Sequence, residues 1–348
     1  MARAERLIQS PEKTESKIQF IDNKKPDIKF GTVFDFMDQF QKFQKETDPY
    51  VDQATVKFKS DNPITVYAIG DVHFGADSSK MDLFMRDMEI IRQTPNAHMV
   101  ILSNLVDAFI PTYHQGGKLN SPMPTEKEAG AMNVLLKQLA AEEKVLAMVH
   151  SPCHEGWSET NAGIDLQKIM FKDTGIPMLE NGGVLKMEIP NGKVFNAGLW
   201  HQPGGSGENK NAPSWNHQAK SRIGTTDIIM IGHSHVGEAE QAFFGEHPNR
   251  GEVALIRSGS YKGNVLNEKD GITDRFQRGH SGRDGEPGGQ SVTLIPRSDQ
   301  MRVHFNPLRA AEYQQKLNKF ATLESTGRLE DVWESANQMA KRIASKEL

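Results

Sequence analysis

The sequence predicts an α/β fold organised around one functional site. From about Ile64 onward, short apolar runs rich in β-branched residues alternate with segments whose apolar residues recur at helical spacing, which is the pattern of an α/β domain. Several of these runs end in residues that commonly bind metals. The later runs lie closer together, and Pro190-Asn191-Gly192 reads as a turn between two of them. We therefore expect antiparallel pairing there, in a sandwich of two sheets with helices outside.

Composition limits the class of protein. The 348 residues suffice for one large domain or two, and 37% hydrophobic with 25% charged residues is ordinary for a soluble globular protein. With 41 basic and 45 acidic residues the net charge is −4, so no general attraction to nucleic acid or to a membrane is expected. A single cysteine excludes an internal disulfide framework. Without a signal-peptide core or a long apolar run, we expect a soluble, cytoplasmic protein.

Residues 1–60 are predicted to form an N-terminal extension with one amphipathic helix. The helix follows Thr32 and should end near Asp48-Pro49. Its apolar residues recur at helical spacing: Val33, Phe36, Met37, Phe40 and Phe43. This stripe either packs onto the parent domain, which we favour, or docks a protein partner.

Residues 61–306 are predicted to form the main domain. The expected helices are Met81–Arg92 and Thr125–Glu142. The expected strands are Ile64–Ile69, His98–Leu102, Lys144–Val149, Val184–Ile189, Val194–Leu199, Asp227–Ile231, Val253–Arg257 and Ser291–Ile295. The polar, glycine-rich stretch 262–290 is expected to be a surface loop, either a lid or a disordered insertion. Residues 307–348 are predicted to form a C-terminal helical extension, with an apolar stripe from Leu329 to Ile343.

Five strand ends carry potential ligands. In Asp-Val-His and His-Ser-His, one intervening residue places two ligands on the same side of an extended backbone. The candidate residues are Asp71 and His73; Asn104 and Asp107; Cys153, His154 and Glu155; His201; and His233 and His235. Because loops at strand ends commonly carry function, we expect these residues to form one site. The remaining histidines lack this context and are interpreted as structural or exposed: His98, His114, His150, His217, His247, His280 and His304.

The order of these motifs resembles that of the calcineurin-like metallophosphoesterases from about residue 64 to residue 262. The segments that match are Gly70-Asp71-Val72-His73, His154-Glu155, His201 and Gly232-His233-Ser234-His235, and Gly259-Ser260-Tyr261 is similar to the strand exit that often follows. The resemblance implies a four-layer α/β/β/α sandwich with added N- and C-terminal helices. It also implies one or two divalent metal ions, zinc or manganese, at one edge of the sheets.

The resemblance implies a role for each matching residue. One metal would be held by Asp71, His73 and His235, and the other by Cys153, His201 and His233, with Asn104 bridging the two. His154 would face the substrate phosphate as general acid or charge stabiliser. Asp107 and Glu155 would be supporting residues.

Two central positions depart from the family. Asn104 replaces the bridging aspartate, so the bridge loses the negative charge that offsets the repulsion between two dications. Cys153 replaces an asparagine. A thiolate at Cys153 would complete a Cys-His-His zinc set with an open fourth position. The alternative is that Cys153 is a small buried filler.

Two functions follow from the resemblance. In the first, the protein is a phosphoesterase in which metal hydroxide attacks a phosphodiester, in a nucleotide or a DNA end; Trp157 either stacks on a base or is packing. The absence of a basic tail disfavours long nucleic acid, and uncharacterised phage and bacterial members of the family have similar Trp-flanked motifs. In the second, the protein is a degenerate member with a structural role, or with a protein partner bound through its terminal helices.

Overall fold

The computed structural model describes residues 33–108, 123–202, 226–233, 235, 237–244, 251–262, 288–297 and 300–325. The chain divides into two compact units, Met1–Asp48 and Pro49–Leu348. Helix α1 (Val33–Thr47) is the described part of the first unit and confirms the predicted amphipathic helix. The packing of its aromatic stripe stays a prediction.

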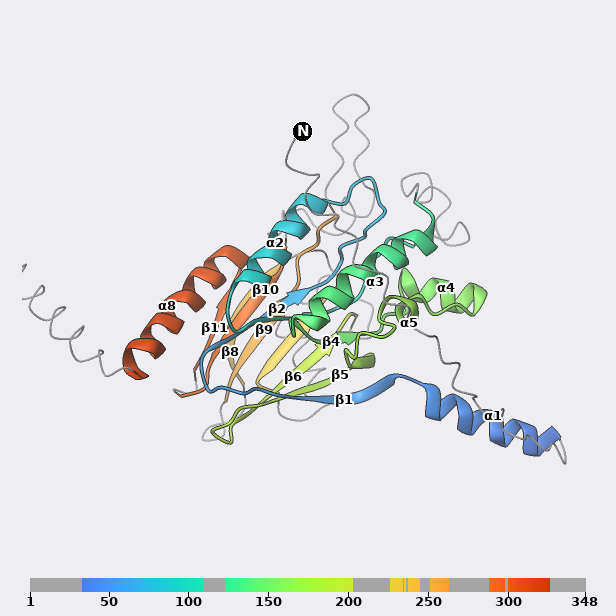
Figure 1. Cartoon of the computed structure of the whole chain (residues 1–348), viewed down its shortest axis with the longest axis horizontal. Coiled ribbons are helices and arrows are strands. Elements are labelled where there is room, and N and C mark those ends of the chain that lie inside the picture. Colours follow the sequence, from blue (N-terminus) through green and yellow to red (C-terminus); the bar gives the residue numbers. More distant parts are fainter. Residues whose placement is uncertain are drawn as a thin grey trace, which may run out of the picture. The chain divides into compact units, whose positions relative to one another are not determined.

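The second unit is built on a mixed, 11-stranded sheet (Figure 1). Its strands are β1 (Tyr50–Lys57), β2 (Ile64–Ile69), β3 (Ala97–Ile101), β4 (Val145–Val149), β5 (Met178–Glu188), β6 (Val194–Trp200), β7 (Ile228–Ile231), β8 (Glu238–Phe244), β9 (Gly251–Arg257), β10 (Gln290–Ile295) and β11 (Gln300–His304). Their order is β11-β10-β2-β3-β4-β5-β6-β7-β9-β8, and β1 pairs with β5 in addition. All eight predicted strands are present, within a few residues of their expected bounds except for the earlier start of β5.

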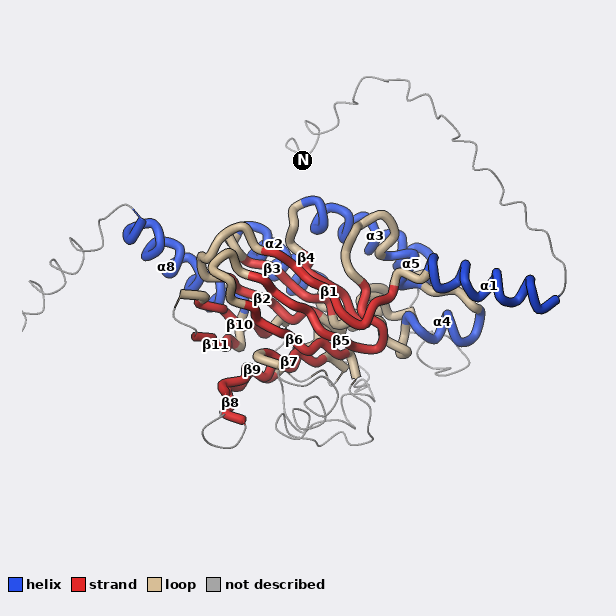
Figure 2. Tube along the Cα trace, turned by 90° about the horizontal axis from the view of Figure 1, so that it is seen from below, coloured by secondary structure: helices blue, strands red, loops and turns tan. Residues whose placement is uncertain are grey.

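The sheet folds over on itself to form two packed layers. Only two residue pairs, Met148↔Met178 and Val149↔Leu179, join β4 to β5. An apolar core then fills the space between the two halves of the sheet, with Val66 on one side and Leu199 and Ile256 on the other. The predicted sandwich is therefore made from two halves of one continuous ladder rather than from two separate sheets (Figure 2).

Helices cover the outer face of the first half of the sheet (Figure 2). They are α2 (Met81–Gln93), α3 (Thr125–Ala141), α4 (Glu155–Ala162), α5 (Leu166–Met170) and α8 (Pro307–Ser325). A second apolar core lies under this layer, where Tyr67 and Ile69 meet Phe84 and Met88. Among the described residues no helix covers the other half, and the connection 203–225 lies outside them, so the predicted fourth layer is not tested.

The expected antiparallel pairing of the later strands is wrong at two places, but it is correct for β5 with β6, for β9 with β8, and for β10 with β2 and β11. Strands β5 and β6 pair antiparallel through the predicted turn, where Gly192 has a φ of 87° and donates to the Ile189 carbonyl. Strands β6 and β7, and then β7 and β9, pair parallel. The long connection over 201–227 allows the crossover that parallel strands need. Parallel pairing brings the carboxyl ends of these strands to one edge.

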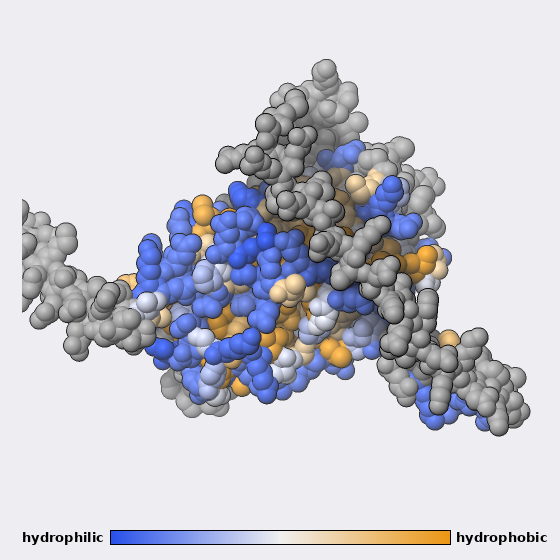
Figure 3. Space-filling view, in the orientation of Figure 1, coloured by the Kyte–Doolittle hydropathy of each residue, from blue (hydrophilic) through white to orange (hydrophobic). Residues whose placement is uncertain are grey.

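The two terminal predictions have different outcomes. Helix α8 confirms that the chain turns helical after Pro307, and it packs in the helical layer, where Gln314 Nε2 donates to the Pro63 carbonyl. The stripe from Leu329 to Ile343, most of the glycine-rich stretch 262–290, and His114, His217, His247 and His280 lie outside the described residues. None of the described helices is long and apolar enough to cross a membrane. Hydrophilic residues predominate on the described surface seen in Figure 3.

The buried His304 is expected to make the protein sensitive to acid. Burial, helped by the charge of Arg302, lowers the pKa of His304 from 6.5 to about 4, and its Nε2 lies 3.0 Å from Thr293 Oγ1. Between about pH 6.5 and pH 4, the His304 imidazole is therefore protonated in the unfolded chain but neutral in the folded protein. The stability linked to His304 is thus present above about pH 6.5 and is lost as the pH falls towards 4. In His304→Gln the melting temperature should fall less steeply with acid than in wild type. Parallel melting profiles of the two proteins would contradict this.

Candidate metal centre

The predicted site residues come together at one edge of the folded sheet. Loops after β2, β3, β4, β6 and β7 supply them. Their backbone is unusual, because eight of the eleven non-glycine residues with positive φ in the described part of the chain are at or next to the site. These are Asp71, His73, Ser103, Asn104, Ala108, His154, His233 and His235. Such conformations cost energy, cluster at functional sites, and persist where surrounding structure enforces them.

The first candidate ligand group is Asp71, His73 and His235. Asp71 Oδ1 lies 3.9 Å from His73 Nε2 and 3.6 Å from His235 Nε2, and the two Nε2 atoms are 3.2 Å apart. Burial would raise the pKa of Asp71, but the neighbouring His235, His201 and His73 outweigh it and hold this pKa below its usual value. Asp71 is therefore ionised and directed towards two imidazole nitrogens.

The second candidate group is Cys153, His201 and His233. His233 Nδ1 lies 3.2 Å from His201 Nε2 and 4.0 Å from Cys153 Sγ. The backbone N–H of His233 donates to Asp71 Oδ2 over 2.7 Å, which connects this group to the first. Gly232 permits the approach, because a Cβ there would lie 3.1 Å from both His201 Nδ1 and the Leu102 carbonyl oxygen. In each group, one potential ligand atom per residue lies within 4.8 Å of the others.

Hydrogen bonds from outside the groups orient two of the imidazoles. His73 Nδ1 lies 3.0 Å from Asp107 Oδ1, and His201 Nδ1 lies 2.6 Å from the Leu102 carbonyl oxygen. Because these oxygens are acceptors, both Nδ1 atoms carry the hydrogen and both Nε2 atoms present a lone pair to their group. Burial lowers the pKa of His73 and of His201, which favours the neutral form that binds metals. This is the arrangement that metal-binding histidines usually have.

Asn104 lies at the predicted bridge, but its amide nitrogen faces the first group. Asn104 Nδ2 donates to Asp71 Oδ1 over 3.1 Å. Asn104 Oδ1 is buried and has no hydrogen-bond partner among the described residues. A buried acceptor without a donor is uncommon and costs free energy, and ligation of a cation by Oδ1 would relieve that cost.

Cys153 is held as a thiol in the absence of a cation. Burial raises the pKa of its thiol to about 11, and Sγ donates to Gln202 Oε1 at 3.6 Å. A thiolate would therefore form only as a divalent cation binds and displaces the proton. The two groups fit a cation such as zinc, because nitrogen, oxygen and sulfur donors lie close together in them. In addition, His73 and His201 are in the tautomer that presents Nε2, and the buried Asn104 Oδ1 has no hydrogen-bond donor among the described residues.

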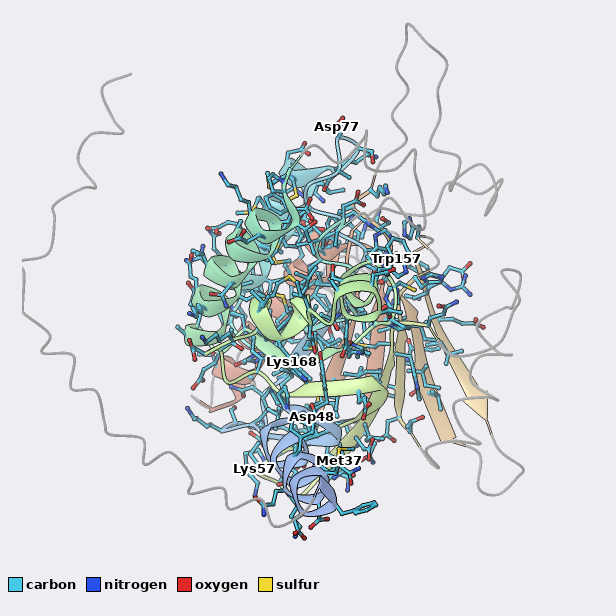
Figure 4. The ribbon with its side chains drawn as sticks, turned by 90° about the vertical axis from the view of Figure 1, so that its right-hand side faces the viewer. Met37, Asp48, Lys57, Asp77, Trp157 and Lys168 are labelled. Carbon is cyan, nitrogen blue, oxygen red and sulfur yellow. The ribbon has the colours of Figure 1, made fainter. Side chains whose placement is uncertain are left out.

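His154 is placed beside the first group by its neighbours on both faces. Its Nδ1 lies 2.6 Å from the Asp107 carbonyl oxygen, and its ring stacks on Trp157 with centroids 4.4 Å apart and 28° between planes. Trp157 lies on α4 (Figure 4). One face of the Trp157 indole therefore packs on His154. Packing was one of the two roles expected for Trp157 from the sequence. Stacking of its other face on a substrate base stays a prediction.

Two residues that the sequence analysis did not single out lie at this site. Lys262 Nζ is 3.3 Å from Asp107 Oδ1, the same oxygen that holds His73, and only 11% of the Lys262 side chain is exposed. Lys262 follows the matched Gly259-Ser260-Tyr261 but was assigned to the glycine-rich loop. Gln167 Nε2 donates to Ser103 Oγ over 2.6 Å. Helix α5, which carries Gln167, was not predicted, because only five residues form it.

The solved structures to which this chain is similar include two of low sequence identity. Vps29 from Entamoeba histolytica, solved with Zn²⁺, is 12% identical, with 70% of this chain and 100% of that chain covered and a TM-score of 0.30. A metallophosphoesterase from Sphaerobacter thermophilus is 14% identical, with 77% and 99% covered and a TM-score of 0.33. No protein-family model and no curated protein matches the chain. Membership of the metallophosphoesterase family stays a prediction from the motifs.

Proposed function

We propose that the protein is a metal-dependent phosphoesterase that hydrolyses a phosphodiester, in a nucleotide or at a nucleic-acid end. The observation that supports this most is the pair of adjacent donor groups in which the imidazoles of His73 and His201 are held with the Nε2 lone pair directed towards the group. Bound divalent cations would neutralise phosphoryl oxygens and lower the pKa of a water molecule. Asp71, His73 and His235 would hold one cation, and Cys153, His201 and His233 would hold a second; the buried Asn104 Oδ1 is a further potential ligand.

The chain's own residues would then handle the proton and the substrate charge. His154 keeps a hydrogen on Nδ1 against the Asp107 carbonyl, and burial lowers the pKa of His154. Its Nε2 therefore carries the lone pair, so this imidazole would first accept a proton from the attacking water molecule and then donate it to the leaving oxygen. The nearly buried ammonium of Lys262 adds positive charge next to Asp107, and this charge favours the binding of an anionic substrate.

A specific observation supports the second candidate function, a degenerate site. The bond from Asn104 Nδ2 to Asp71 fills the bridging position without any cation, and the Cys153 thiol also has an acceptor. In this case the fold would serve a structural role or bind a protein partner. The two functions differ in whether a divalent cation is retained.

Metal content and hydrolysis of a model diester test the proposed function. The purified full chain is expected to carry zinc or manganese and to hydrolyse bis-p-nitrophenyl phosphate faster than the monoester p-nitrophenyl phosphate. His235→Ala should lose the cation held by the first group and the activity, because Nε2 of His235 faces both Asp71 and His73. His98→Ala is the matched control, since His98 lies on β3 away from both groups and bonds the Glu143 carbonyl.

The opposite result would favour the degenerate site. In that result, the wild-type protein binds neither zinc nor manganese when these are added. Metal binding and activity then appear only when Asn104→Asp is combined with Cys153→Asn. Faster hydrolysis of the monoester would leave metal dependence in place but contradict the proposed substrate class.

A further inference from the structure

A second set of potential ligands lies behind the loop that carries Cys153 and His154. His150 follows β4 directly, Glu159 lies on α4, and Asp165 is the N-cap residue of α5. One nitrogen or oxygen from each lies within 4.8 Å of the others, and His150 Nε2 is 3.3 Å from Glu159 Oε2. None of the three belongs to the groups around Asp71 and His201. From the sequence, His150 was interpreted as structural or exposed.

The hydrogen bonding of His150 is incomplete. The residue is 9% exposed, and its Nδ1 is buried with no hydrogen-bond partner in the part of the chain that the structure describes. A histidine with a purely structural role normally uses both ring nitrogens, because a buried unsatisfied nitrogen costs about 1–3 kcal/mol.

The two carboxylates are arranged for a cation rather than fully neutralised. Tyr50 Oη donates to Asp165 Oδ2 over 2.8 Å, and the Tyr50 ring meets the His150 ring edge-on at 4.7 Å. Lys168 Nζ is 3.6 Å from the same Asp165 oxygen, but its side chain is 41% exposed (Figure 4). Asp165 therefore contacts a partly exposed ammonium, while Glu159 contacts the imidazole of His150. Tyr50 acts on Asp165 as an outer hydrogen-bond donor does on a ligating carboxylate.

We propose that His150, Glu159 and Asp165 bind a divalent cation of the zinc type, at a site separate from the candidate catalytic centre. One imidazole and two carboxylates are a donor set that zinc accepts, with water completing the coordination. The cation would tie the end of β4 to α4 and α5, and so would fix both ends of the segment that carries Cys153, His154 and Glu155. The proposal does not depend on phosphoesterase activity.

Zinc titration of the metal-stripped full chain by calorimetry tests the site. His150→Gln and Glu159→Gln should each bind one zinc ion fewer than wild type. Tyr50→Phe keeps the ring contact with His150 but removes the hydroxyl donor to Asp165, so it should weaken the same site by roughly 10–100-fold, as loss of an outer-shell partner does. His98→Gln and the exposed Glu126→Gln are matched controls and should bind as wild type does.

A His235→Ala background separates this site from the candidate catalytic centre. The zinc ion lost with Glu159→Gln should still be present in His235→Ala and should disappear when the two changes are combined. The proposal is overturned if folded His150→Gln and Glu159→Gln bind as many zinc ions as wild type with the same affinity. If both variants fail to fold, unchanged zinc affinity in Tyr50→Phe overturns it instead.

Discussion

Asn104→Asp is expected to destabilise the metal-free protein and to strengthen its binding of divalent cations. In wild type, Asn104 Nδ2 donates to Asp71 Oδ1 over 3.1 Å, and both residues are buried. In the variant, this contact becomes one between two carboxylates. Two like charges about 3 Å apart repel by roughly 5 kcal/mol at an effective dielectric constant of about 20, unless they share a proton.

The melting temperature of the metal-free Asn104→Asp protein should therefore fall by about 10–20 °C when both carboxylates are ionised, and by less when they share a proton, since 1 kcal/mol corresponds to about 2–4 °C in a large domain. Zinc or manganese should reverse the loss, because a cation between the carboxylates turns repulsion into attraction. We expect affinity to rise at least about tenfold, or 1.4 kcal/mol.

Thermal melting with EDTA and with added manganese measures both effects. Asn96→Asp is the matched control, because Asn96 also has a positive φ but lies in the turn before β3, away from the site. Equal melting temperatures for Asn104→Asp and wild type in EDTA, together with equal gains from manganese, would show that no cation binds between Asp71 and residue 104.

The central strands could be predicted from sequence because burial on both faces leaves a clear apolar run. Ile64–Ile69 is buried throughout and was predicted with its observed bounds. Strands β1, β8 and β11 were missed because their sequences contain no such continuous apolar run. In β1 only Ala54 is buried, and β8 reads Glu-Ala-Glu-Gln-Ala-Phe-Phe. Strands β1 and β8 are each paired with one neighbouring strand through backbone hydrogen bonds, and such pairing does not require a pattern of apolar residues in the sequence.

Strand β5 begins well before its predicted first residue, Val184. In the structure the strand begins at Met178, and Gly182 has a φ of 114° where a Cβ would clash with the Trp200 ring. The glycines allow a close approach within the strand rather than a chain reversal.

The grouping of the site followed from the sequence because each candidate ligand lies in the loop that follows a buried strand. The spacing of Asp71 and His73, and of His233 and His235, was sufficient to place them together. The hydrogen bonds that set the imidazole tautomers were not predictable, since His201 is fixed by a main-chain carbonyl of Leu102, far away in sequence. The cluster around His150 was missed because its partners lie on α4 and α5, whose packing carries no motif.

Replacing Glu155 is expected to disrupt the site from its supporting side. Glu155 is 1% exposed. Its Oε2 accepts from Ser103 Oγ and from the Asn104 backbone N–H, at 3.3 and 3.1 Å, and its Oε1 accepts from the Val106 N–H at 3.2 Å. The Asn104 carbonyl in turn accepts from the backbone N–H groups of Val72 and His73. The Glu155 carboxylate thus holds Asn104 in place, and Asn104 in turn positions Val72 and His73 in the loop after β2.

Glu155→Ala leaves buried donors without an acceptor, at about 1–3 kcal/mol each, so the free energy of unfolding should fall by roughly 3–6 kcal/mol. Glu155→Gln should lose less, because one amide oxygen remains as an acceptor. Glu126→Ala, an exposed carboxylate on α3, controls for the loss of charge and should have little effect. Urea unfolding in EDTA measures the three variants without any contribution from bound metal.

The pH dependence of this loss distinguishes Glu155 from an ordinary buried hydrogen-bonding residue. Burial raises the pKa of Glu155 from 4.5 to about 7. The folded protein therefore holds a proton there that the unfolded chain releases, so the stabilisation is complete below about pH 4.5 and is lost as the pH rises through 7. The difference of about 2.5 pKa units corresponds to about 3 kcal/mol. The stability gap between wild type and Glu155→Gln should be wider at pH 5 than at pH 8; a constant gap would mean that Glu155 is ionised throughout and acts only as an acceptor.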